Sequence, residues 1–222
     1  MKVCAYCGKK NPETKDHVPP KGIFAPPRPN FLVTVPCCND CHSDTAKDDE
    51  YFRNMLAMRK DTFRHPDVQG ILPKIFRSFS KPEQKKLTKS LIKSIKKTEL
   101  KTSEGIYLGS VVTYDADLSR LDKVVQRIAK GLYYHENNVI FPINGKVKSY
   151  TLHDLNIFKK DKIERIIEVL SNAQVKEIGK KTLVYRMAKG EFEHLGLWLL
   201  TFFENVDFLV FMIPPTKKEN TV

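Results

Sequence analysis

The sequence contains two short motifs, Cys4-Ala5-Tyr6-Cys7 and Cys38-Asn39-Asp40-Cys41, separated by thirty residues. A Cys-x-x-Cys turn places two thiolates on one side of a tight loop, and two such turns supply the four corners of a tetrahedral zinc site. Four thiolates leave no open coordination position, so the predicted zinc is structural. It would fasten the N-terminus to the start of the segment that follows Cys41.

The fifth cysteine, Cys37, leaves one alternative for this ligand set. It could replace Cys38, but the spacing to Cys41 would then be three rather than two. We therefore favour Cys38 as the ligand and Cys37 as a buried thiol. All five cysteines lie in the first 41 residues, which favours metal binding over a disulfide framework; chance clustering is the competing interpretation.

Between the two motifs stands the stretch Thr14-Lys15-Asp16-His17-Val18-Pro19-Pro20. A neutral imidazole, with an ordinary pKa near ~6.5, can take a proton from water at neutral pH. A carboxylate is a ligand for Mg²⁺ or Mn²⁺. Neighbouring residues on a strand point to opposite sides, so Asp16 and His17 could approach one phosphate only where the strand ends or bends. Taken without the cysteines, Asp16 could cap a turn and His17 could make an ordinary polar contact.

Framed by the two cysteine motifs, this Asp-His pair resembles the HNH endonucleases of the ββα-metal class over residues 1 to about 54. The resemblance implies an α+β protein with an N-terminal zinc-stapled, treble-clef-like ββα unit, followed by a mixed α+β region. It implies that Asp16 binds a catalytic Mg²⁺ or Mn²⁺ ion. His17 would be the general base that activates water to cut a phosphodiester bond in DNA.

The resemblance implies two further site residues, Asn30 and His42. Asn30 would fasten the loop and orient His17, and His42 would be a second ligand of the catalytic ion. Cysteine-bearing members often have Asn where this chain has His42, which leaves the preferred metal open. The alternatives are a turn residue at Asn30 and a zinc ligand at His42. The acidic run Asp48-Asp49-Glu50 is predicted to stabilise a helix N-terminus, or alternatively to touch the metal.

The formal net charge of +12 and the pI of about 9.4 indicate a polyanionic partner, either nucleic acid or an anionic membrane surface. The first ten residues are polar, without the apolar core of a secretory leader. The most apolar stretch, Leu195 to Pro214, is broken by Glu204, Asn205 and Asp207. We therefore expect a soluble, cytoplasmic protein without a membrane partner.

A basic stretch, Lys74 to Lys101, carries ten Lys or Arg against two acids. Its centre is predicted to be a helix over Lys81–Lys97, capped by Ser80, with its leucines and isoleucines on one face and lysines on the other. A solvated lysine face is the competing interpretation of a phosphate-binding one. The residues predicted to bind nucleic acid are Lys85, Lys89, Lys93 and Lys96.

Three segments are predicted: the nuclease domain 1–60, the basic helical segment 61–104 and an α+β region 105–222. Strands are expected at Phe31–Val35, Ile106–Tyr114, within Val139–Tyr150, at Leu183–Met187 and in a hairpin over Leu195–Ile213 that turns at Glu204-Asn205. The first half of this hairpin could alternatively be a buried helix, because both of its faces are apolar. Helices are expected from about residue 44 to 60, at Asp117–Tyr134 and at Lys159–Leu170. The helix Asp117–Tyr134 is predicted to be amphipathic, and the residues expected on its inner face are Leu118, Leu121, Val124, Val125, Ile128 and Leu132. Two rival functions are a zinc-stabilised nucleic-acid-binding module without catalysis and an RNA-cutting nuclease.

Overall fold

The computed structural model describes residues 2–43, 45–102, 104–151 and 157–215. The chain divides into two compact units. The first unit joins residues 1–71 with residues 119–222, and the second comprises residues 72–118. The predicted nuclease segment and most of the predicted C-terminal region therefore belong to one unit. The division into three functional segments stays a prediction.

A five-stranded antiparallel sheet forms the core of the first unit. Its strands are β5 (Lys146–Thr151), β6 (Val175–Ile178), β7 (Leu183–Lys189), β8 (Gly196–Phe202) and β9 (Val206–Ile213), in the order β5-β9-β8-β7-β6. Trp198, Leu200 and Phe202 alternate along β8 and are fully buried. The alternation places these side chains on one face of the sheet, as a strand period of two requires. The predicted hairpin over Leu195–Ile213 is confirmed as β8 and β9.

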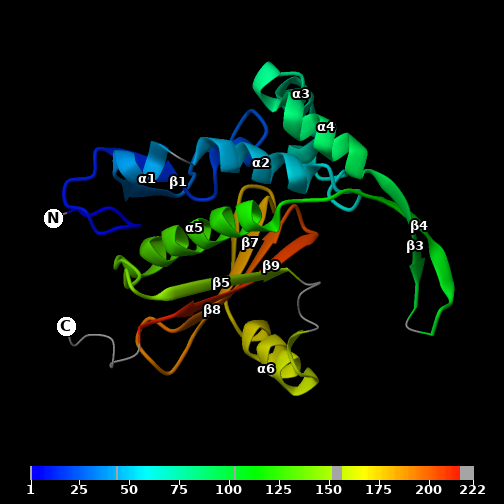
Figure 1. The fold of residues 1–222 in the computed structure, drawn as a ribbon. Coiled ribbons are helices and arrows are strands. Elements are labelled where there is room, and N and C mark those ends of the chain that lie inside the picture. Colours follow the sequence, from blue (N-terminus) through cyan, green and yellow to red (C-terminus); the bar gives the residue numbers. More distant parts are fainter. Residues whose placement is uncertain (1, 44, 103, 152–156, 216–222) are drawn as a thin grey trace. The chain divides into compact units, whose positions relative to one another are not determined.

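Helices cover both faces of this sheet (Figure 1). Helices α2 (Ala46–Ala57) and α5 (Leu118–Asn137) lie on one face, and α6 (Lys160–Ser171) lies on the other. On the first face, the ring of Phe52 in α2 packs edge-on against Phe202 with centroids 5.1 Å apart.

Helix α5 confirms the expected amphipathic pattern, with one exception. Leu118 was expected to face inward, but it is exposed because it is the first residue of the helix. The other predicted inward residues are all buried: Leu121, Val124, Val125, Ile128 and Leu132.

The N-terminal segment forms a separate small sheet from β1 (Thr14–His17) and β2 (Thr34–Cys37). A short 3-10 turn, η1 (Lys21–Ile23), lies in the long proline-rich loop between them, and α1 (Asn39–Ser43) follows β2. The predicted strand Phe31–Val35 begins three residues too early and ends two residues too early, because β2 spans Thr34–Cys37. Only residues 34–37 pair with β1, whereas Phe31 is 93% exposed.

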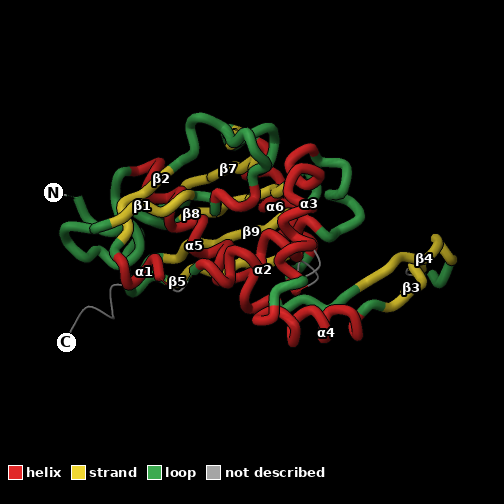
Figure 2. The backbone as a smooth tube through the Cα atoms, turned by 90° about the horizontal axis from the view of Figure 1, so that it is seen from above, coloured by secondary structure: helices red, strands yellow, loops and turns green. Residues whose placement is uncertain are grey.

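The second unit differs most from expectation. Helix α3 (Pro66–Phe79) leads into it, followed by η2 (Pro82–Gln84), α4 (Lys85–Ser94) and the antiparallel strands β3 (Lys96–Lys101) and β4 (Tyr107–Thr113), shown side by side in Figure 2.

The predicted helix Lys81–Lys97 is therefore too long at both ends. Ile95 adopts an extended backbone conformation, which ends α4 and begins the strand pair. Ile92 and Ile95, expected on the inner face, are exposed, while Leu91 is buried. Ser80 does not cap the helix, because its hydroxyl donates to the Phe76 carbonyl of α3. Within the described ranges, no helix combines the length and apolar character needed to cross a bilayer.

Candidate metal centre

The two cysteine motifs meet in space. The thiol sulfurs of Cys4, Cys7, Cys38 and Cys41 all lie within 4.8 Å of one another, and those of Cys7 and Cys38 are 3.6 Å apart. These four residues could hold a metal ion, and four thiolates in this arrangement are consistent with zinc. The cluster contains Cys38 and not Cys37, in agreement with the predicted ligand set.

Backbone hydrogen bonds form the first of the two turns and attach it to β2. The Gly8 N–H donates to the Cys4 carbonyl at 2.9 Å, and Gly8 has a φ of +74°, a conformation that favours glycine. The Ala5 N–H donates to the Pro36 carbonyl at 2.9 Å. The second motif lies at the junction of β2 and α1. The cysteine cluster therefore joins the N-terminal turn, β2 and α1.

Cys4 and Cys37 are both buried, but their pKa values are shifted in opposite directions. Burial alone would raise the pKa of Cys4, but backbone hydrogen bonds from Cys38, Tyr6 and Cys7 outweigh it and bring the pKa to about 7. Burial raises the pKa of Cys37 to about 12, and the charge of Cys4 adds to this effect. Burial also raises the pKa of Cys41, a member of the cluster. The position of the sulfurs, and not their pKa, therefore separates the four candidate ligands from Cys37.

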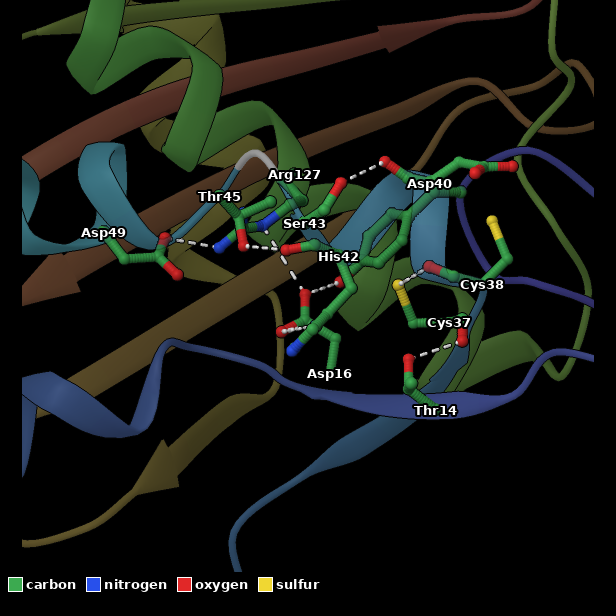
Figure 3. Close-up of polar contacts among 11 residues, drawn as sticks. Thr14, Asp16, Cys37, Cys38, Asp40, His42, Ser43, Thr45, Asp49 and Arg127 are labelled. Atoms are coloured by element: carbon green, nitrogen blue, oxygen red, sulfur yellow. Dashed lines mark hydrogen bonds and ion pairs between the residues drawn. The ribbon is translucent and has the colours of Figure 1, made fainter.

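Asp16 lies next to this cluster, and its two carboxylate oxygens have different neighbours (Figure 3). Oδ2 accepts a hydrogen bond of 2.7 Å from the Tyr6 hydroxyl and lies 3.5 Å from Arg127 Nε. Oδ1 lies 3.8 Å from Nδ1 of His42. The carboxylate is 5% exposed in spite of its charge. Such burial is acceptable only with partners of this kind.

His42 belongs to α1 and owes its place to the second cysteine motif. Its backbone N–H donates to the Cys38 carbonyl at 3.1 Å, while its side chain is 46% exposed. The four-cysteine cluster is complete without this imidazole. His42 is therefore available to a second ion shared with Asp16.

His17 is the last residue of β1. The strand therefore ends at the Asp16–His17 pair, as required if both side chains are to approach one phosphate. Burial lowers the pKa of this half-buried imidazole. The charges of Lys21, Arg28 and His42 lower it further, and Asp16 acts in the opposite direction. The resulting neutral imidazole at neutral pH is the form that a general base requires.

Asn30 is exposed at a bend before β2. Among the hydrogen bonds of the described part of the chain, none joins Asn30 to His17. The orienting role of Asn30 stays a prediction.

The acidic run at the beginning of α2 binds arginines of α5. Asp48 accepts a hydrogen bond of 2.6 Å from Arg120 Nε, and Asp49 pairs with Arg127. Figure 3 shows Arg127 between Asp49 and Asp16. Burial raises the pKa of Asp49 to about 6, although Arg127 opposes this effect.

Two residues of this site, Tyr6 and Arg127, were not predicted from the sequence. Tyr6 lies inside the first cysteine motif, and a large side chain with a hydroxyl at that position could have been recognised as a candidate site residue. Arg127 and Arg120 are seven residues apart on the polar face of a predicted helix. That spacing places both on one side of α5, but it does not identify their partners.

The predicted nucleic-acid-binding lysines occupy two elements of the second unit. Lys85, Lys89 and Lys93 are exposed and follow one another at intervals of four along α4, so they form one stripe. Lys96 is exposed too, but it lies on β3. We call these four residues the lysine stripe.

Comparison of the chain with protein-family models, with curated proteins and with solved structures finds no match in any of the three. The functional conclusion therefore depends on the chemistry of the site.

Proposed function

We propose that this protein is a metal-dependent endonuclease of the HNH type that hydrolyses phosphodiester bonds in DNA. One observation carries the proposal: Asp16 Oδ1 and His42 Nδ1 lie 3.8 Å apart, and His42 directly follows the cluster residue Cys41. A buried carboxylate and a half-exposed imidazole are thus turned toward one another next to His17, the candidate base.

The donor set suits a catalytic Mg²⁺ or Mn²⁺ ion. Ligands about 2.0–2.1 Å from such an ion, at right angles to one another, lie about 3 Å apart. The 3.8 Å between Asp16 and His42 is within reach of a small rotation of the exposed imidazole. One carboxylate and one imidazole leave several positions for water and phosphate. When bound, the ion would stabilise charge on the phosphate and on the leaving 3′ oxygen.

His17 would take a proton from the attacking water. Its lowered pKa keeps the imidazole neutral, and it stands at the end of β1, adjacent to the metal ligand Asp16. General base catalysis of this kind contributes typically ~10²–10⁴ in rate.

The order of the N-terminal elements also supports this proposal. Strand β1 carries Asp16 and His17, strand β2 pairs with it, and α1 supplies His42. This is the strand-strand-helix order that the ββα-metal resemblance requires. A structural zinc ion in the cysteine cluster would hold these short elements together, since such ions contribute directly to folding.

The lysine stripe would supply a separate grip on the substrate. Lysine contacts to phosphates give affinity without sequence information, which suits an enzyme with a small catalytic unit. A purely binding function is the alternative that this basic surface favours; such a module needs no carboxylate and histidine pair beside its zinc.

The test is cleavage of a supercoiled plasmid by the full chain with Mg²⁺, Mn²⁺ or EDTA. We expect cutting with either metal and none with EDTA. His17→Ala should lower the rate by about 10²–10⁴ while DNA affinity and zinc content stay unchanged. His135→Ala changes an exposed histidine on α5 and is the matched control. Cutting by His17→Ala at the wild-type rate would leave the binding module as the better interpretation.

Metal rescue separates the roles of the site residues. Asp16→Ala should stop cleavage by loss of the ion, so excess Mn²⁺ should restore part of its activity and none of that of His17→Ala. His42→Asn should retain more activity than His42→Ala, because the amide oxygen can still bind metal. An RNA of matching sequence as substrate decides between the DNA-cutting and RNA-cutting functions.

A further inference from the structure

One oxygen of the Asp16 carboxylate is held by neighbouring side chains, and the other faces His42. Oδ2 accepts the Tyr6 hydroxyl and faces Arg127 Nε, while Oδ1 faces His42. A carboxylate without such partners rotates freely and exchanges its two oxygens. The partners of Oδ2 therefore decide which oxygen is available to a metal ion.

We propose that Tyr6 and Arg127 are positioning residues that set the metal affinity of this site by fixing Oδ1 of Asp16 toward His42. The inference rests on the proposed function, because it assumes an ion between Asp16 and His42. It adds two residues to the site, and one of them, Arg127, comes from α5, far outside the segment that resembles HNH nucleases.

Tyr6 connects the cysteine cluster to the carboxylate. It lies between Cys4 and Cys7, and its side chain packs against Cys4, Cys37 and Cys38. The Tyr6 hydroxyl donates to Asp16 at 2.7 Å. A zinc ion that orders the turn would therefore also order the hydroxyl that holds Asp16.

Arg127 connects α5 to the same carboxylate. Its guanidinium pairs with Asp49 as well as Asp16, and its side chain is only 13% exposed. One helical turn further along, a Cβ added to Gly131 would lie 2.6 Å from Val18 Cγ2 and 3.2 Å from the Tyr6 hydroxyl. Glycine at this position therefore allows α5 to approach Tyr6 closely and brings Arg127 within reach of Asp16.

Arg127 also lies between two acids, the buried Asp16 and the half-buried Asp49. Asp49 and Asp16 lie on either side of one guanidinium (Figure 3). Without Arg127 the two carboxylates would repel one another, and Asp16 would be free to turn away from His42. Residues that hold a metal ligand in place typically contribute ~10–100-fold to metal affinity.

Arg120 is an internal comparison for Arg127. It lies on the same helix and pairs with the neighbouring acid Asp48 at 2.6 Å. Its guanidinium also donates to the Lys47 carbonyl and lies 4.1 Å from the Tyr51 ring centroid. Arg120→Met therefore removes the same kind of link between α5 and α2 without removing a partner of Asp16.

The sign of the effect distinguishes positioning from simple electrostatics. Arg127 is a cation, and a cation close to a metal ion repels it. If charge alone mattered, Arg127→Met would bind Mn²⁺ more tightly than the wild type. If Arg127 positions Asp16, Arg127→Met binds Mn²⁺ more weakly.

The experiment is a titration of the zinc-loaded full chain with Mn²⁺, followed by the loss of the free-ion electron paramagnetic resonance signal. We expect about tenfold or greater weakening in Tyr6→Phe and in Arg127→Met, a smaller loss in Arg127→Lys and no change in Arg120→Met. Zinc content and far-ultraviolet circular dichroism of each variant establish that it is folded. Mn²⁺ affinity of Arg127→Met and Tyr6→Phe within twofold of the wild type, or tighter, overturns the inference.

The proposed function fails differently. If Asp16→Ala binds Mn²⁺ as tightly as the wild type, Asp16 is not a metal ligand. The proposed metal site is then wrong, and so is the positioning role that depends on it. Binding that depends on Asp16 but not on Tyr6 or Arg127 overturns the positioning role alone.

Discussion

Residues 2–43 and the five-stranded sheet belong to the same compact unit, but they are stabilised by different contacts. The sheet buries alternate large side chains, such as Trp198, Leu200 and Phe202. The N-terminal segment has two strands of four residues and a five-residue helix, arranged around four cysteines. Elements this short bury too little apolar surface to be stable without a cross-link.

The difference shows how a buried polar site can coexist with a stable fold. A carboxylate such as Asp16 is costly in a purely apolar core. Around Asp16 the cysteine cluster adds to the packing of a few buried apolar residues, among them Val18 and Val35. Helix α5 serves both regions: its apolar face packs on the sheet, and Arg127 and Gly131 meet the N-terminal elements. This helix therefore links the sheet to the site.

The largest expected effect is loss of the N-terminal structure when its metal is removed. Structural zinc sites in small peptides bind with ~10–16 kcal/mol, and binding is coupled to folding. Wild-type protein should contain about one zinc per chain by elemental analysis. Cys4→Ser should lose this zinc, and its amide hydrogens in β1 and β2 should exchange rapidly while those of β8 and β9 stay protected.

The matched control is Cys37→Ser, which changes a buried cysteine outside the four-thiol cluster. It should keep its zinc. Equal zinc content in Cys4→Ser and wild type, or equal protection of β1, would show that the two regions do not differ as proposed.

A core substitution in the sheet should lower the unfolding free energy without releasing the zinc. Leu200→Ala removes a fully buried side chain of β8 and should cost about 2–5 kcal/mol of unfolding free energy, measured by urea denaturation. Zinc content should not change. Leu199→Ala is the control, because Leu199 is only half-buried on the other face and should cost less. A larger loss in Leu199→Ala would contradict the assignment of the two faces.

The elements that could be predicted are those with strong local signals. The two cysteine motifs, the amphipathic pattern of α5 and the turn at Glu204-Asn205 all lie within short stretches of sequence. At that turn Phe203 and Glu204 have φ values of +49° and +65°, so the reversal of the chain is sharp. Periodicity and spacing suffice for such features because their contacts are local.

The features that could not be predicted depend on distant contacts or contradict local preference. Helix α3 contains Gly70 and Pro73, which normally indicate a break, and β3 is mostly polar. Arg127 and Asp16 are far apart in sequence, and no periodicity relates them. The pairing of the N-terminal site with α5 therefore became evident only from the fold.

An ion pair between α5 and the sheet provides a smaller effect that depends on pH. Glu136 accepts a hydrogen bond of 2.6 Å from the Tyr185 hydroxyl and pairs with Lys176. Burial alone would raise the pKa of Glu136, but these two partners outweigh it and lower the pKa below its ordinary value of 4.5. A carboxyl group whose pKa is lowered by folding stabilises the protein above that ordinary value. The contribution is lost as the pH falls through the lowered pKa.

Glu136→Gln should therefore be less stable than wild type by about 1–3 kcal/mol at pH 7, with a difference that shrinks as the pH falls below about 4.5. Urea denaturation of both proteins between pH 7 and pH 3 measures this difference. Glu164→Gln, at an exposed position of α6, should show little difference at any pH. A constant difference between Glu136→Gln and wild type across this range would mean that the charge of Glu136 contributes nothing.

The lysine stripe belongs to neither of the two regions, so changing it should leave the stability of both unaltered. Reversing the charges of Lys85, Lys89 and Lys96 to Glu should weaken DNA binding for all sequences, because phosphate contacts carry no sequence information. The dependence of log affinity on log salt concentration should become shallower by about one for each lost contact. Fluorescence anisotropy with two unrelated duplexes over a series of salt concentrations measures both effects.

The same reversals at Lys159, Lys160 and Lys162, exposed at the beginning of α6, alter the net charge equally and should change the slope less. Equal changes in the two triple variants would mean that DNA responds to net charge alone, and an unchanged slope in the first would mean that the stripe is only solvated.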